Sequence, residues 1–127
     1  MREQELNVYV VLKNEKEEIL LLKRHNGIWE FPGGGVEWGE HPFNSAKREA
    51  EEETGLKVEL EGILCVTSAT FEKKDIQKHA VYIVYQGSGS GEVILSGEHK
   101  DFKWIPPKEM EDHKLGLNVA PVKMFLR

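Results

Sequence analysis

The sequence is poor in cysteine and in long apolar runs, and each shortage excludes a class of protein. Its single cysteine, Cys65, has no second cysteine in the chain to pair with, so the apolar segment ILCV around it predicts a buried thiol. No apolar stretch approaches the roughly 20 residues that a membrane-spanning helix needs. The polar start MREQELN lacks the features of a signal peptide, and we therefore expect a cytoplasmic protein.

The chain also lacks an excess of positive charge. Its 17 lysines and arginines are outnumbered by 22 aspartates and glutamates, which leaves a formal net charge of −5. Long nucleic acids bind clustered basic residues, so this balance argues against them and favours a free nucleotide as the partner. A polyphosphate near so many carboxylates requires a cation that offsets the repulsion. We expect Lys23 and Arg24 to contact the phosphates, although a solvated strand end explains these two residues equally well.

The order of the expected elements indicates an α+β (mixed α/β) fold in one domain, residues 1–127. Apolar, β-branched segments predict strands over residues 8–12, 19–23, 62–70, 79–86 and 103–105, the first two joined as a hairpin. The segment GSGSGE after Gln86 predicts a flexible turn. Asn118 is expected to cap a final helix that ends at Phe125.

What the chain has in abundance is glutamate, and one cluster lies on a predicted helix. Pro42 suits the first turn of this helix and Gly55 suits a left-handed stop after Thr54. Three carboxylates, here called the box glutamates, lie three or four residues apart and so within about 5 to 6 Å of each other on the helix: Glu49, Glu52 and Glu53. Carboxylates that close repel unless a cation intervenes, and oxygen ligands favour Mg²⁺, Mn²⁺ or Ca²⁺ over zinc, so we expect a divalent ion, Mg²⁺. An ordinary solvated helix face is the alternative.

Residues 34–56 fit the spacing G-x5-E-x7-R-E-U-x-E-E-x-G-U, where U is a bulky aliphatic residue. The matching positions are Gly34, Glu40, Arg48, Glu49, Ala50, Glu52, Glu53, Gly55 and Leu56. This pattern resembles the Nudix hydrolase box, with the smaller Ala50 where Ile, Leu or Val is usual. The resemblance implies the Nudix fold, a mixed β-sheet sandwiched between helices. It also implies hydrolysis of the diphosphate linkage in a nucleoside diphosphate derivative.

The same resemblance implies roles for individual residues. The box glutamates correspond to metal ligands, Gly34 donates a backbone carbonyl, and Arg48 bends to orient the ligand carboxylates. Glu52 or Glu53 is a candidate general base, but many relatives use a glutamate from a later loop, for which Glu98 is the candidate. A plain surface carboxylate explains Glu98 equally well. The five histidines show no ligand spacing, so none is expected at the metal.

Trp29 and Phe71 are among the aromatic residues that are candidates for stacking on the base. Trp29 lies before the Gly33–Gly35 run, which would let the backbone turn tightly, and Phe71 ends a predicted strand. A place in the core is the alternative for each ring.

The substrate is less well marked than the chemistry. Relatives that cleave ADP-ribose commonly have a proline shortly after the box, but this chain has none between Phe43 and Ile105. Relatives acting on diadenosine polyphosphates often have a tyrosine there, where this chain has Glu72 and Lys73. The sequence instead resembles the small antimutator type, which converts nucleoside triphosphates, including oxidised ones, to monophosphate and pyrophosphate.

Other readings remain open at the level of the sequence. ADP-ribose or another nucleotide sugar is the alternative substrate, and a nucleotide-binding module without turnover is the alternative of another class. The intact box glutamates argue against the binding module, because binding alone gives no reason to keep repelling carboxylates together. The oligomeric state, including a homodimer, and the number of metal ions are left undecided.

Overall fold

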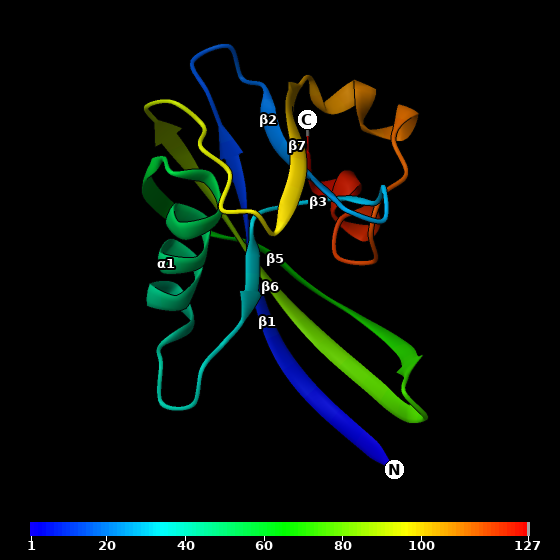
Figure 1. The fold of residues 1–127 in the computed structure, drawn as a ribbon. Helices are drawn as coiled ribbons and strands as arrows, with labels where there is room; N and C mark the ends of the chain where they lie inside the picture. Colours follow the sequence, from blue (N-terminus) through cyan, green and yellow to red (C-terminus); the bar gives the residue numbers. More distant parts are fainter. Residues whose placement is uncertain (127) are drawn as a thin grey trace.

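The computed structural model describes residues 1–126 and confirms the mixed α+β class. Seven strands occur in that part of the chain: β1 (Arg2–Lys13), β2 (Ile19–Arg24), β3 (Trp29–Glu30), β4 (Gly33–Gly35), β5 (Lys57–Lys73), β6 (Ile76–Ser90) and β7 (His99–Ile105). They are accompanied by helix α1 (Pro42–Thr54) and by the 3₁₀ helices η1 (Pro107–Asp112) and η2 (Ala120–Phe125) (Figure 1). None of the helices within residues 1–126 is long and apolar enough to cross a membrane.

The strands form one mixed sheet with the order β3-β2-β1-β6-β5, while β4 pairs with β1 and β7 pairs with β2. The central pair β1 and β6 is parallel, and the other pairs are antiparallel. Figure 1 shows that β1, β5 and β6 extend together well beyond the rest of the molecule, with the N-terminus at the far end. The helices therefore pack against the body of the sheet, and the long strands β1, β5 and β6 project beyond that body.

Helices cover both faces of the body of the sheet, as the resemblance implied. Helix α1 packs on one face through Ala46 and Ala50, both fully buried (Figure 1). The 3₁₀ helices cover the other face, where Met110 and Val122 are buried. Alternate residues of β1 serve the two cores, since successive side chains of a strand point to opposite faces.

Helix α1 begins and ends where the sequence predicts. Pro42 occupies the first turn, and Gly55 closes the helix in the left-handed conformation with φ 72°. The N–H of Gly55 donates to the carbonyl of Glu51 over 2.9 Å. A residue with a Cβ would be strained at this φ, which explains why glycine stands at the stop.

The predicted hairpin between residues 8–12 and 19–23 is confirmed as the antiparallel pair β1 and β2, but its pairing is short. The two strands meet at a single pair of residues, Lys13 and Ile19. On its other edge β1 pairs with β6 from Arg2 to Lys13, and β2 pairs with β7 from Ile19 to Arg24. The sequence shows that two strands are joined by a short turn, but it does not show that β4, through Gly33 to Gly35, takes the edge of β1 on the side of β2, at Asn7 to Tyr9.

The flexible turn predicted for GSGSGE is also wrong, because Gly87 to Ser90 continue strand β6. A Cβ at Gly87 would collide with the carbonyl oxygen of Glu59 on the neighbouring strand. A Cβ at Gly89 would lie 2.8 Å from the Leu56 side chain. These glycines are therefore needed because neighbouring chain segments pack closely against the strand. The Gly/Ser composition, which is typical of linkers, led to the wrong prediction of a turn.

The final predicted helix is a 3₁₀ helix that begins later than expected. Val119 stands at its N-cap, with no capping hydrogen bond from a side chain. Asn118 is buried and donates from Nδ2 to Glu30 Oε1 over 3.2 Å instead. An asparagine before a helix is a common N-cap residue, but here the Asn118 side chain forms its hydrogen bond with the buried carboxylate of Glu30.

Candidate active site

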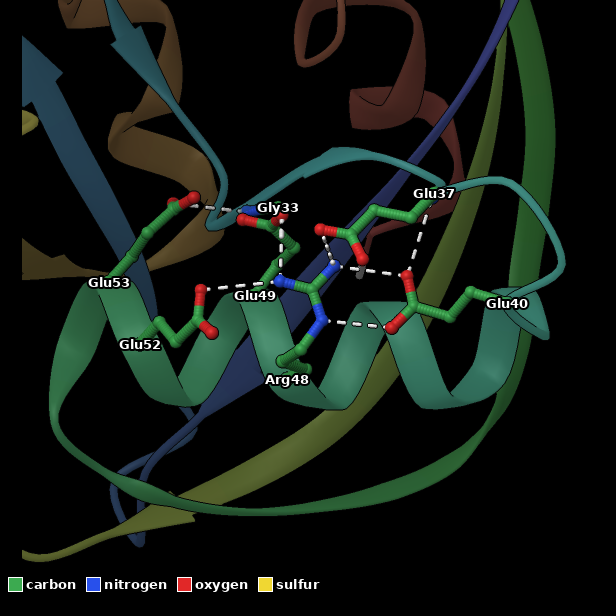
Figure 2. A network of polar contacts seen from close by, with 7 residues as sticks. All are labelled: Gly33, Glu37, Glu40, Arg48, Glu49, Glu52 and Glu53. Atoms are coloured by element: carbon green, nitrogen blue, oxygen red, sulfur yellow. Dashed lines mark hydrogen bonds and ion pairs between the residues drawn. The ribbon is translucent and has the colours of Figure 1, made fainter.

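The box glutamates lie along one edge of α1 and differ in their exposure (Figure 2). Glu53 is buried at 3% exposed, the side chain of Glu49 is 18% exposed, and that of Glu52 is 59% exposed. Glu51 faces away and accepts a hydrogen bond from the N–H of Val58 over 3.0 Å. The helical spacing thus gathers three carboxylates and turns the fourth towards the following strand.

Arg48 lies at the centre of this acidic cluster (Figure 2). Its Nε and Nη2 donate to the two oxygens of Glu40 over 2.8 and 3.0 Å, a bidentate contact. Its Nη1 donates to Glu49 over 3.2 Å and to Glu52 over 3.3 Å. The guanidinium holds the pKa of Glu40 at about 2. Arg48 therefore fixes the positions of neighbouring carboxylates, including that of the adjacent residue, which straight helical spacing would not bring into reach.

Glu53 is the carboxylate with the strongest need for a cation. Burial raises its pKa well above the ordinary value, and the neighbouring carboxyls of Glu49 and Glu98 add to the rise. The N–H of Gly33 donates to Glu53 Oε1 over 3.2 Å and partly opposes it. A buried carboxylate beside two others is stable in its charged form only if a positive charge joins them.

The glycine run before the helix is a short strand and not the tight turn that the sequence suggested. Gly33 to Gly35 form β4, paired with Asn7 to Tyr9 of β1. A Cβ at Gly33 would collide with the carbonyl oxygen of Val8, and a Cβ at Gly34 would lie 3.0 Å from the Glu49 carboxylate. Glycine is thus required by the close approach of β1 on one side and of a box glutamate on the other.

A second acidic position reaches the cluster from the loop before β7. One carboxylate oxygen of Glu53, one of Glu98 and one ring nitrogen of His99 all lie within 4.8 Å of one another. We call these three residues the Glu98 corner. His99 lies at this corner although its spacing in the sequence gives no sign of it, because the pairing of β7 with β2 brings it there.

Glu30 connects this corner to the other side of the sheet. Its carboxylate accepts hydrogen bonds from Arg24 Nη2 over 2.6 Å, from His99 Nε2 over 2.7 Å and from Asn118 Nδ2 over 3.2 Å. Burial alone would raise the pKa of Glu30, but the hydrogen bonds from His99 and Arg24 outweigh it and lower the pKa to about 2. Sequence reasoning missed Glu30, although a charged residue between the buried Trp29 and Phe31 is a signal for it.

An open pocket of about 430 Å³, here called the Tyr9 pocket, adjoins Glu30. Its walls come from β1, β2, β5, β6 and the segment before η2, and include Tyr9, Arg24, Phe71, Tyr82 and Asn118. The volume lies in the range that small-molecule sites occupy. A larger hollow of about 730 Å³ lies over the extended ends of β1, β5 and β6, and its lining shares only Phe71 with the Tyr9 pocket. The Tyr9 pocket is the one joined to the glutamates, through Arg24 and Glu30.

Two of the residues expected to bind substrate lie elsewhere. Trp29 is 5% exposed and packs in the core, edge-on to His113. The ammonium group of Lys23 lies 5.5 Å from the centre of the Trp29 ring, and that of Lys103 lies 5.2 Å from it. Trp29 and Lys23 thus support each other at the edge of the sheet. Arg24 and Phe71, the other two candidates, do line the Tyr9 pocket.

The donor set fits a divalent cation. Its ligands are carboxylate oxygens, one of them buried, which is the chemistry that Mg²⁺, Mn²⁺ and Ca²⁺ select. The glycine backbone beside Glu49 also leaves a space that a side chain would fill. A cation would offset the burial and the repulsion by neighbouring carboxyls that raise the pKa of Glu53.

Known proteins share this sequence and this fold. The profile of the NUDIX domain matches residues 3–125. The nucleoside triphosphatase NudI of Escherichia fergusonii is 33% identical over 108 residues, which cover 76% of this chain and 73% of that protein. The putative 8-oxo-dGTP diphosphatase of Bacillus subtilis is 31% identical over 101 residues, 78% of this chain but less than two thirds, 64%, of that protein.

A solved structure agrees with these relatives. The crystal structure of the MutT protein from Methanosarcina mazei Go1 superposes with a TM-score of 0.81 at 30% identity, over 98% of this chain and 91% of that one. Profile, relatives and fold coincide over nearly the whole described length, and the chain belongs to the NUDIX domain family.

Proposed function

We propose that residues 1–127 form one catalytic domain that hydrolyses the diphosphate linkage of a nucleotide in a metal-dependent reaction. The observation that carries this proposal is the meeting of Glu53, from the helix, with Glu98, from a distant loop. The Tyr9 pocket lies within two hydrogen bonds of that meeting point, through Arg24 and Glu30. A nucleotide can thus place its base in the pocket and its phosphates at the carboxylates.

The box glutamates would hold the cation, with the carbonyl of Gly34 as a backbone ligand. Mg²⁺ is the proposed ion and Mn²⁺ the alternative, because the donors at the helix are oxygens. When bound, the ion neutralises phosphoryl charge and makes water acidic enough to attack. Arg48 keeps Glu49 and Glu52 in place through the contacts described above.

The protein supplies the proton acceptor and the binding groups. Glu98 is exposed and lies beside Glu53, so it can take the proton of the attacking water, a step otherwise left to Glu52 or Glu53. Arg24 lines the pocket and can contact a phosphate, and Phe71, another lining residue, offers a ring to the base.

A nucleoside triphosphate, including an oxidised one, is the proposed substrate, with nucleoside monophosphate and pyrophosphate as products. Two similar proteins carry the names nucleoside triphosphatase and putative 8-oxo-dGTP diphosphatase, which supports this choice. ADP-ribose is the alternative. A nucleotide-binding module without turnover would have no need to bury Glu53 beside Glu98, so the catalytic proposal is preferred.

The substrate proposal is tested by incubating the protein with Mg²⁺ and with matched concentrations of nucleoside triphosphates, an oxidised guanosine triphosphate and ADP-ribose. Triphosphates should release pyrophosphate, whereas ADP-ribose would yield AMP and ribose phosphate. We expect kcat/KM for a triphosphate to exceed that for ADP-ribose by more than about tenfold, roughly 1.4 kcal/mol. The reverse preference would overturn the substrate and leave the chemistry standing. Excess chelator should abolish turnover.

The metal role is tested by Glu53→Gln, with Glu51→Gln as the matched control on the same helix. Losing the buried ligand should lower kcat by at least about 10²-fold, some 2.7 kcal/mol in the barrier. Folding should be nearly unchanged without metal, because the raised pKa already keeps Glu53 uncharged at neutral pH and glutamine resembles that form. Glu51 faces Val58, so its variant should keep the full rate. Full activity of Glu53→Gln at saturating Mg²⁺ would refute the assignment.

A further inference from the structure

His99 lies beside Glu53 and Glu98 and has one ring nitrogen without a hydrogen-bond partner in the described residues. The residue is 5% exposed and opens strand β7, directly after Glu98. Its Nε2 is engaged with Glu30 Oε2 at 2.7 Å. Its Nδ1 is buried and finds no hydrogen-bond partner within residues 1–126. One ring nitrogen of this histidine lies within 4.8 Å of a carboxylate oxygen of Glu53 and of one of Glu98, and Nδ1 is the buried nitrogen still free to take a ligand.

The hydrogen bond to Glu30 decides which nitrogen carries the hydrogen. Glu30 forms an ion pair with Arg24 at 2.6 Å and also accepts from the amide of Asn118, so its carboxylate acts as a hydrogen-bond acceptor. Nε2 must then be the protonated nitrogen. In the neutral imidazole Nδ1 consequently offers a lone pair, which is the form that binds metal ions.

The spacing of the Glu98 corner fits one cation. Ligand atoms on opposite sides of a divalent ion are about 4 to 5 Å apart, given bonds of about 2.0 to 2.6 Å. The three ligand atoms of the corner lie within 4.8 Å of one another. Metal-binding histidines usually donate their other ring N–H to a carboxylate, which fixes the ring. His99 makes this kind of hydrogen bond to Glu30 through Nε2.

We propose that Nδ1 of His99 is a ligand of a divalent cation held together with Glu53 and Glu98. This proposal rests on the metal-dependent function proposed above and adds a nitrogen to a site otherwise built from oxygen. Glu98 retains a second carboxylate oxygen for the proton of the attacking water. A nitrogen ligand also changes the choice of metal, because imidazole favours Co²⁺ and later first-row ions and adds little for Mg²⁺.

The direct test is pulsed electron paramagnetic resonance of the protein loaded with Mn²⁺, which detects nitrogen bonded to the ion. We expect a ¹⁴N coupling in the wild type that changes to a ¹⁵N pattern when histidine alone is labelled with ¹⁵N. The coupling should vanish in His99→Gln, whose amide nitrogen can replace Nε2 towards Glu30 but leaves nothing at Nδ1. The control is His113→Gln, because His113 packs on Trp29 and bonds to the carbonyl of Glu109, away from the corner.

Each outcome separates this proposal from the proposed function. Bound Mn²⁺ without nitrogen coupling in the wild type would overturn the role of His99 and leave the metal-dependent function intact. Coupling that persists in His99→Gln would overturn it as well. A wild-type protein that binds no Mn²⁺ would overturn both. If His99→Gln fails to fold, the ¹⁵N-histidine experiment on the wild type still decides.

Metal affinity gives a second readout that does not depend on turnover. In His99→Gln the Kd for Co²⁺ should rise by at least about tenfold, while the Kd for Mg²⁺ should change by less than about threefold. Titration calorimetry with each metal alone measures both values. An equal loss for the two metals would indicate a general distortion of the site and would contradict a nitrogen ligand.

Discussion

The acidic edge of α1 and the Tyr9 pocket are built in opposite ways. The edge takes its carboxylates from one helix and holds them with an arginine from the same helix. The pocket takes its walls from four strands and a late loop, between Glu5 and Asn118. Local spacing therefore dictates the position of the carboxylates, whereas the shape of the pocket depends on how the sheet is assembled.

The largest effect should come from Glu98, which belongs to the acidic site in space but to a distant loop in the sequence. Glu98→Gln should lower kcat by about 10² to 10⁴-fold with little change in nucleotide affinity, if this carboxylate takes the proton. Glu92→Gln is the matched control, because Glu92 is exposed in the segment that leads to the same loop. Steady-state kinetics measure both. Near wild-type kcat for Glu98→Gln would return the base to Glu52 or Glu53, and the chemistry would then be wholly local.

Glu30, which links the acidic edge to the Tyr9 pocket through its hydrogen bonds, should make the free energy of unfolding depend on pH. Glu30 has a folded pKa of about 2 and an ordinary value of 4.5, so between these values the unfolded chain binds a proton that the folded one does not. Stability should therefore fall as the pH is lowered from about 4.5 to about 2, by about 1 to 3 kcal/mol.

Denaturant unfolding across this pH range measures the effect, and Glu30→Gln should remove part of the slope. The total stability of that variant is not the readout, because Arg24, His99 and Asn118 would all lose the charged group that accepts their hydrogen bonds, which lowers stability at every pH. An unchanged slope would show that Glu30 does not connect the regions in the way that its hydrogen bonds indicate.

The smallest effect should appear within the Tyr9 pocket. Phe71→Ala should raise KM by about tenfold and leave kcat nearly unchanged, because stacking on a base contributes about 1 to 3 kcal/mol. Phe43→Ala is the control, since Phe43 is exposed on α1 and packs against Tyr85 outside the pocket. A fall in kcat with constant KM for Phe71→Ala would mean that the pocket acts on the chemistry and not on binding.

The sequence was sufficient where structure depends on near neighbours. Pro42 and Gly55 predict the ends of α1, and helical spacing predicts the cluster of glutamates. It was insufficient where long-range pairing decides. His99 and Glu30 are 69 positions apart, and their contact exists only because β7 and β3 flank β2. A turn was wrongly predicted at Gly87 because the residue that packs against it, Glu59 on the neighbouring strand, is far away in the sequence.

The parallel pairing of β1 with β6 has a consequence for the order of folding. Arg2 pairs with Gln77, so the chain must close a loop of 75 residues before the centre of the sheet exists. Such non-local pairing is slow compared with the formation of a helix. Helix α1 can therefore form early, while Glu98 reaches Glu53 only after the sheet is complete. In a refolding experiment metal binding at the Glu98 corner would accordingly be among the last signals to recover.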